Sequence, residues 1–151
     1  MCGIKSKLNY TEFSEFISSF DVLGLSETKT DDIDQIHIPG FITFMKNRHK
    51  LSKVRSGGII LSAREDIVKH VKIIDTDCKY VLWFKIDKMF LNYDEDLICG
   101  IVYIPPEGSK FSSSESFIEF EQELISVVKD YKYVCLMGDF NARVGHLKDY
   151  T

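Results

Sequence analysis

Apolar residues recur with two different periods along the chain and predict a mixture of helices and strands. In residues 11–20, phenylalanine and isoleucine follow the i, i+3, i+4, i+7 spacing of one helix face, and a similar stripe predicts a helix over 112–130. A polar residue with a glutamate three positions later suggests a capping box before each helix, Asn9 with Glu12 and Ser112 with Glu115.

Short runs of β-branched and aromatic residues predict strands between and around these helices. The predicted strands cover residues 21–25, 41–46, 57–62, 66–74, 79–86, 97–104 and 132–137. Several neighbouring strands are separated only by short polar segments, and the order lacks regular β-α-β alternation. The pattern therefore predicts an α+β fold with a largely antiparallel or mixed sheet.

The composition is that of one folded domain, with 151 residues, 44% of them hydrophobic and 28% charged. No apolar run reaches the length of a membrane span or of a signal peptide, so we expect an intracellular protein without membrane contact. The four cysteines have no metal-ligand spacing, and Cys99 and Cys135 read as small buried apolar residues. The net charge of −4 counts against bulk electrostatic binding of nucleic acid, but it permits local binding of a few phosphates with a metal ion.

Two polar side chains follow the last predicted strand in the stretch "LMGDFNARVG". In extended backbone Asp139 and Asn141 would share one face while Phe140 points into the core. A carboxylate beside an amide suits a site that orients a water or metal ion and an oxyanion substrate. The alternative is an Asx-turn after the strand, with Asn141 as an ordinary turn residue.

Two further residues at strand ends are candidates for the same chemistry. Glu27 follows the strand at 21–25, where an acid is most often a solvated turn residue. Tyr103 precedes Pro105 and Pro106, which end the strand at 97–104. Its phenol suits a hydrogen bond to a phosphate oxygen, although a tyrosine at the edge of the core is the more common interpretation.

A basic segment lies between the strands at 41–46 and 57–62. Five cations fall within ten residues without an acid: Lys46, Arg48, Lys50, Lys53 and Arg55. Such a run is usually a solvated loop, but it also suits salt-sensitive contacts with the DNA backbone.

Four motifs in one order resemble the endonuclease/exonuclease/phosphatase superfamily, which has the DNase I-like fold. They are "SETK" at 26–29, "SGGI" at 56–59, "YIPP" at 103–106 and "GDFNA" at 138–142. The fuller stretches "LSETKT" and "GDFNARVG" are most similar to the endonuclease domain of non-LTR (LINE-type) retrotransposons. The resemblance covers essentially the whole chain and implies a four-layer α/β-sandwich.

The resemblance also implies a role for each candidate residue. Glu27 would bind Mg²⁺ (or Mn²⁺), a hard cation that prefers carboxylate oxygen and retains waters. Tyr103 would contact the scissile phosphate, Asp139 would activate or position the attacking water, and Asn141 would hydrogen-bond the phosphate. The expected reaction is hydrolysis of a DNA phosphodiester, stabilised by the metal and these donors.

Two parts of the family pattern are missing from this sequence. The family's first strand carries an asparagine in "N-x-x-G", which would fall before Met1 if Gly3 holds the glycine position. The family's "S-D-H" motif comes well after "GDFN", and this chain ends at Thr151. We therefore expect a partial domain over 1–151, the N-terminal portion of the sandwich. About one of the two sheets would be present, with an apolar face left uncovered.

The resulting functional hypothesis is a fragment of a Mg²⁺-dependent DNA endonuclease of retrotransposon origin. A reverse transcriptase domain would be its partner in the full element, and its location would be nuclear if it is functional. Because the catalytic set is incomplete, we expect little or no nuclease activity from this chain. Two alternatives stay open: a phosphatase on a small phosphorylated ligand such as an inositol phosphate, and a non-catalytic nucleic-acid-binding remnant.

Overall fold

A computed structural model describes residues 3–31, 33–47 and 57–142 of the chain. Its helices and strands follow in this order: α1 (Ile4–Lys7), α2 (Thr11–Ser18), β1 (Val22–Ser26), β2 (Phe41–Lys46), β3 (Ile59–Arg64), the 3-10 helix η1 (Val68–His70), β4 (Val71–Ile74), β5 (Val81–Ile86), α3 (Lys88–Leu91), β6 (Leu97–Tyr103), α4 (Ser116–Val128) and β7 (Tyr133–Asp139). Within these described ranges, no helix is long and apolar enough to cross a membrane.

The strands form two sheets. The small sheet is antiparallel throughout and has the strand order β1-β3-β2. The large sheet has the order β4-β5-β6-β7, in which β6 and β7 run parallel and the other neighbours antiparallel. The predicted α+β class with mixed strand pairing is therefore confirmed.

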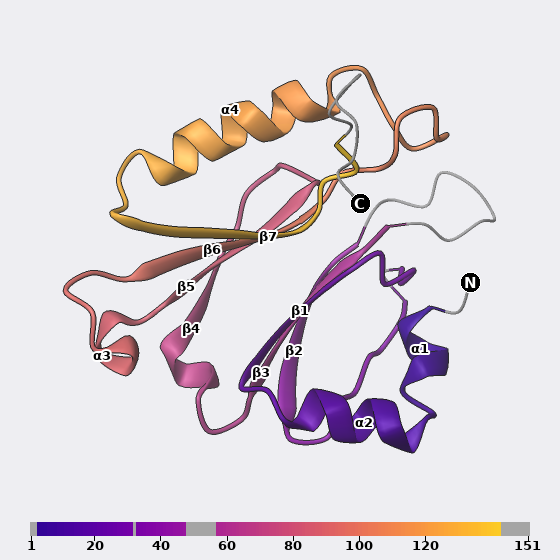
Figure 1. Ribbon diagram of the computed structural model, residues 1–151, viewed down its shortest axis with the longest axis vertical. Helices are drawn as coiled ribbons and strands as arrows, with labels where there is room; N and C mark the ends of the chain where they lie inside the picture. Colours follow the sequence, from indigo (N-terminus) through magenta and orange to yellow (C-terminus); the bar gives the residue numbers. More distant parts are fainter. Residues whose placement is uncertain (1–2, 32, 48–56, 143–151) are drawn as a thin grey trace, which may run out of the picture.

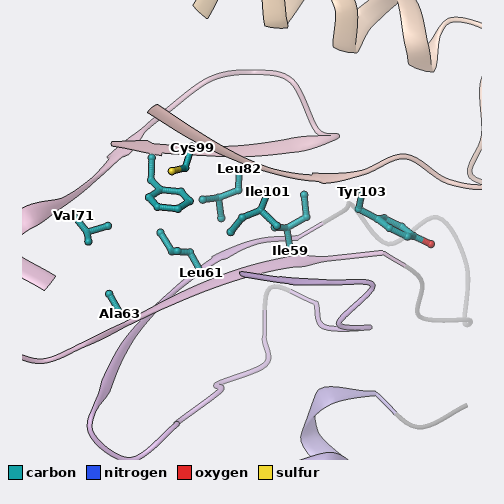
Figure 2. Packing of buried hydrophobic residues seen from close by; sticks show 9 residues of the cluster. Ile59, Leu61, Ala63, Val71, Leu82, Cys99, Ile101 and Tyr103 are labelled. Atoms are coloured by element: carbon teal, nitrogen blue, oxygen red, sulfur yellow. The ribbon is translucent and has the colours of Figure 1, made fainter. Parts of the chain in front are cut away.

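The two sheets pack face to face, with a helix on each outer face (Figure 1). Between the sheets, Leu61 and Ala63 of β3 pack in one cluster with Leu82 and Phe84 of β5. Figure 2 shows this inter-sheet cluster, with side chains reaching toward each other from both sheets. The expectation that only one sheet would be present, with an apolar face uncovered, is wrong. Each sheet supplies alternating apolar positions that bury those of the other.

Two further clusters join the helices to the outer faces of the sheets. Phe120 of α4 packs on Trp83 of the large sheet, and Ile17 of α2 packs on Leu23 and Ile60 of the small sheet. The chain therefore has four layers, in the order α4, large sheet, small sheet, and α2 with α1 (Figure 1).

Alternation along β6 separates two of these clusters. Cys99, Ile101 and Tyr103 belong to the inter-sheet cluster, whereas Ile98 and Val102 belong to the cluster beneath α4. Burial raises the pKa of the Cys99 thiol to about 12, so it packs as a neutral, small apolar group.

Both predicted capping boxes are wrong. Helix α2 begins after Tyr10, and α4 begins after Glu115, in each case without a side-chain hydrogen bond from the capping residue. Before α4, Ser113 Oγ instead accepts a hydrogen bond from the Glu115 amide at 3.1 Å. This local bond stabilises a turn that competes with an earlier start of the helix.

The strand predicted over 66–74 is only half correct. Residues 71–74 form β4, but the chain first makes the turn and 3-10 helix η1. Ile67 is buried and Val68 packs against the inter-sheet cluster at this point. These apolar residues fill the corner where the chain leaves the small sheet for the large one, which a strand running straight on would not do.

Candidate functional site

Strands β1, β6 and β7 end at the same side of the two packed sheets (Figure 1). β1 contacts both β6 and β7 across the interface. The contact is close because β1 carries Gly24, where an added Cβ would lie 3.0 Å from the side chain of Ile101. Ser26 and Tyr103 each lie two residues, about 7 Å of strand, beyond that contact. We name the ends of these three strands the strand-end site.

Tyr103 and Asp139 are neighbours at this site. They are register partners in the parallel β6–β7 pair, so their side chains share the face of the large sheet that looks toward the small sheet. The Tyr103 ring is buried at the end of the inter-sheet cluster, and its hydroxyl points away from the other side chains (Figure 2). Asp139 is exposed. The sheet therefore places a phenol and a carboxylate side by side.

Gly138 determines how closely Asp139 approaches β6. A Cβ at Gly138 would lie 2.0 Å from the carbonyl oxygen of Val102, and the residue has φ +136°, which side chains rarely allow. One residue later, the Ile104 amide donates to the Asp139 carbonyl at 3.0 Å. Only glycine lets the two backbones meet this tightly, and the contact fixes the position at which Asp139 leaves the strand.

Asn141 lies in a tight turn, and the expectation of extended backbone from Asp139 to Asn141 is wrong. β7 ends at Asp139, and Asn141 has φ +45°. The Asn141 amide donates to Asp139 Oδ1 at 3.0 Å, an Asx-turn, while Asn141 Nδ2 donates to the Ile104 carbonyl at 2.9 Å. The local bond to the aspartate replaces the strand ladder as the partner of this amide. As predicted, Phe140 turns into the core, where its ring meets Phe120 edge-on with centroids 5.8 Å apart.

Glu27 begins the loop that follows β1. The side chain is exposed and takes part in no hydrogen bond or ion pair with the described residues. Its backbone has φ +52°, and that of Lys29 has φ +57°. Both values lie in the left-handed region, which residues other than glycine and asparagine seldom adopt.

Two glycines from the start of β3 hold this loop in place. The amides of Thr28 and Lys29 donate to the carbonyls of Gly58 and Gly57 at 3.2 and 2.8 Å. A Cβ at Gly58 would lie 2.5 Å from Thr28 Oγ1. The glycines of "SGGI" therefore fix the loop at 27–30 through their backbone carbonyls and through the close approach that a missing side chain allows.

Backbone strain gathers at the strand-end site. Among the described residues, four other than glycine have positive φ: Glu27, Lys29, Asn92 and Asn141. Asn92 caps the short helix α3, and the other three belong to the two loops of the strand-end site. Such conformations cost about 1–3 kcal/mol each and persist where the surroundings enforce them, often at functional sites.

The carboxylates of the strand-end site are oxygen ligands of the kind that Mg²⁺ prefers, but the described residues do not supply a full set of protein ligands. In the described part of the chain no group of three histidine, cysteine or acidic residues is placed to hold a metal. Glu27 and Asp139 are the exposed acids at the ends of β1 and β7. Mg²⁺ is commonly held by one or two carboxylates with waters completing its shell, and an exposed acid at each of these two strand ends fits that mode.

Most of the basic segment lies outside the residues that the structure describes. Arg48, Lys50, Lys53 and Arg55 lie outside the described residues. Lys46 ends β2, where its ammonium donates to the Thr76 carbonyl at 2.9 Å, and burial lowers its pKa. Lys46 therefore belongs to a strand rather than to a loop, and its ammonium ties β2 to the loop after β4. Its contact with DNA stays a prediction.

No family model matches the chain, and no curated protein matches it. The geometry of the strand-end site therefore carries the functional conclusion. Sequence reasoning proposed Glu27, Tyr103, Asp139 and Asn141 as site residues, and that stays a prediction; it missed the structural roles of Gly24 and Gly138. Each glycine meets a residue more than thirty positions away, which no local spacing indicates.

Proposed function

We propose that the strand-end site is the metal- and phosphate-binding corner of a divalent-cation-dependent phosphodiester hydrolase that acts on DNA. The proposal places the chain with DNase I-like endonucleases of retrotransposon type. The observation that carries it is that β1, β6 and β7 end at one side of the packed sheets, where Tyr103 and Asp139 are register partners. Glu27, exposed and in a left-handed conformation, comes directly after β1. The four-layer arrangement of the sheets and helices supports the same assignment.

Each residue has a task that its position allows. Glu27, exposed and unpaired among the described residues, would hold Mg²⁺ through its carboxylate. A bound divalent cation supplies charge neutralisation for the phosphodiester as it is hydrolysed. Asp139 keeps one carboxylate oxygen for the Asx-turn and presents the other, Oδ2, where it can accept a proton from an attacking water.

The remaining donors would bind the phosphate. The Tyr103 hydroxyl leaves the inter-sheet cluster at the same edge as Asp139 (Figure 2). Asn141 Nδ2 uses one hydrogen for the Ile104 carbonyl and retains a second for a substrate oxygen. These donors are held by the β6–β7 pair rather than by a loose loop, so they are oriented before substrate arrives.

A second candidate is a nucleic-acid-binding remnant without catalysis. It is favoured by the finding that the described residues hold no three-ligand metal group. The phosphatase alternative has no comparable observation in its favour.

The test is the effect of Mn²⁺ on DNA affinity, measured by fluorescence anisotropy with a labelled 20-base-pair duplex. We expect Mn²⁺ to tighten binding by the unmodified chain and to have no such effect on Glu27→Gln. The matched control is Glu12→Gln, which removes another exposed carboxylate, on α2, and should keep the full Mn²⁺ effect.

The other outcomes separate the alternatives. DNA affinity that needs no metal and survives Glu27→Gln would identify the remnant. Mn²⁺-dependent binding of an inositol polyphosphate in preference to the duplex would favour the phosphatase. Binding of neither ligand would contradict the proposal.

A further inference from the structure

A cavity of about 640 Å³ opens beside Asn141, on the side of the turn that faces α4. Its walls come from the loop after β6, the first turn of α4 and the residues that follow β7. Those used in the argument are Glu107, Ser109, Ser112, Ser114, Phe117 and Asn141. The volume is within the range of small-molecule sites and large enough for a nucleoside.

The serine-rich loop that forms one wall has a defined conformation. The Ser109 amide donates to the Pro106 carbonyl and the Ser112 amide to the Ser109 carbonyl, both at 3.1 Å. The Ser116 hydroxyl, which is buried, donates to the Tyr80 hydroxyl at 2.9 Å and thereby ties the start of α4 to the large sheet. The cavity is therefore preformed by hydrogen bonds within the loop.

The chemistry of the walls selects a neutral, planar ligand. Phe117 lines the cavity and is 47% exposed, so its ring is available for stacking. Among the described residues that line the cavity there is no lysine, arginine or histidine, and Glu107 is the one ionisable group. An anionic group such as a phosphate would meet the Glu107 carboxylate and no counter-charge from these residues, so this part of the wall favours a neutral ligand.

Two side chains of the walls offer oxygens that only accept hydrogen bonds, the Glu107 carboxylate and the Asn141 amide. Asn141 Nδ2 donates one hydrogen to the Ile104 carbonyl, and its Oδ1 remains to accept a hydrogen bond. The Glu107 carboxylate accepts only, and serine hydroxyls can do either. A ligand that donates from an exocyclic amine matches this set, as carboxylates do when they accept from the cytosine amine.

We propose that this cavity is a nucleobase subsite, which stacks a base on Phe117 and favours a base with an exocyclic amine over thymine. The inference rests on the proposed function for its setting, since Asn141 belongs to both the cavity and the strand-end site. A base in the cavity would sit next to the phosphate held at the strand-end site. The subsite would thus give the protein a preference for the base beside the phosphate that it binds.

The experiment uses nucleosides, which carry no phosphate and therefore need neither metal nor Glu27. Deoxycytidine, thymidine and 2-deoxyribose are titrated into the ¹⁵N-labelled 151-residue chain, and amide shifts are followed by NMR. We expect deoxycytidine to shift amides in 107–117 and at 141–142. Thymidine should bind several-fold more weakly, and 2-deoxyribose should cause no shift.

Variants at Phe117 test the stacking directly. Phe117→Ala should weaken deoxycytidine binding by roughly 5-fold or more, the range of aromatic–base stacking, while Phe117→Trp should retain it. Phe20→Ala is the matched control, because Phe20 is a 40% exposed aromatic next to α2 on the opposite layer. Unchanged amide resonances in β5 and β6 verify that each variant is folded.

Three results would overturn the inference: no shifts with deoxycytidine, equal binding of deoxycytidine and thymidine, or equal binding by Phe117→Ala and the unmodified chain. Glu27→Gln should bind deoxycytidine normally. A failure of the proposed function would appear separately, as the absence of a Mn²⁺ effect on duplex affinity.

Discussion

Replacing Gly138 with alanine would force apart the two strands that present Tyr103 and Asp139. The new Cβ would lie 2.0 Å from the Val102 carbonyl oxygen and 2.8 Å from the carbon and nitrogen of the same residue. Reaching even a tight contact of 3.0 Å requires β7 to move by at least 1.0 Å, since 3.0 − 2.0 = 1.0. That shift lengthens the 3.0 Å hydrogen bond from the Ile104 amide to the Asp139 carbonyl beyond bonding distance.

The expected loss of stability has two sources. The φ of +136° is strained for alanine and costs up to about 3 kcal/mol. The broken strand hydrogen bond adds about 1 kcal/mol, so Gly138→Ala should destabilise the fold by about 2–4 kcal/mol. Gly40→Ala is the control, because Gly40 has φ +79° but no atom within 4 Å of its added Cβ. Gly40→Ala should lower the free energy of unfolding by only about 1–2 kcal/mol, the cost of placing alanine in a left-handed conformation.

The assay is urea unfolding followed by the fluorescence of Trp83, which is fully buried in the large sheet. We expect the urea concentration at the unfolding midpoint to be clearly lower for Gly138→Ala than for Gly40→Ala. Equal midpoints for the two variants would refute the reasoning, because they would mean that backbone strain alone, without the contact to β6, sets the cost.

Three further predictions concern the loop after β1, an exposed ion pair and the reaction itself. Glu27→Gly should relieve the strain at φ +52° and stabilise the fold by about 1 kcal/mol, but it should abolish Mn²⁺ binding. Lys29→Gly should also stabilise the fold and should still bind Mn²⁺. Urea unfolding measures the stability of both variants, and Mn²⁺ titration measures their metal binding. Hydrogen bonding, chiefly from Lys132 Nζ at 2.6 Å, lowers the pKa of Asp94 to about 2. Because this pKa is depressed in the folded state, the stabilisation is present above pH 4 and is lost as the pH falls toward 2; urea midpoints of the unmodified chain and Asp94→Asn should therefore differ at pH 5 and converge near pH 2. In a metal-dependent plasmid assay, the 151-residue chain should nick no faster than the Glu27→Gln/Asp139→Asn double variant, and robust nicking that the double variant loses would contradict the expected lack of activity.

Local sequence patterns predicted the elements well where one property dominated. The strand at 41–46 matches β2 to the residue, because a β-branched and aromatic run directly follows Pro39 and Gly40. The start of α4 was placed four residues too early, since Ser113 satisfies the Glu115 amide in a turn that the periodicity does not register. The division of the strands between two sheets depends on contacts between distant segments, which a period of two along one strand cannot encode.

The candidate site shows the same limit. Glu27 and Asp139 were identifiable because each is an acid at the end of an apolar strand. The left-handed conformation of Glu27 depends on Gly57 and Gly58, about thirty residues away, and glutamate itself gives no signal of positive φ. An Asx-turn at Asn141 was one of the two interpretations that the sequence allowed. An aspartate side chain often accepts a hydrogen bond from the backbone amide two residues later.

The most direct test of the central claim is where Mn²⁺ binds, measured by paramagnetic broadening of amide resonances. The account predicts that one Mn²⁺ broadens the amides of residues 27–29, 103–104 and 139–141 together, because the three strand ends form one site. Glu27→Gln should remove this broadening. Broadening confined to another acidic segment such as 94–96, or to only one of the three strand ends, would contradict the account.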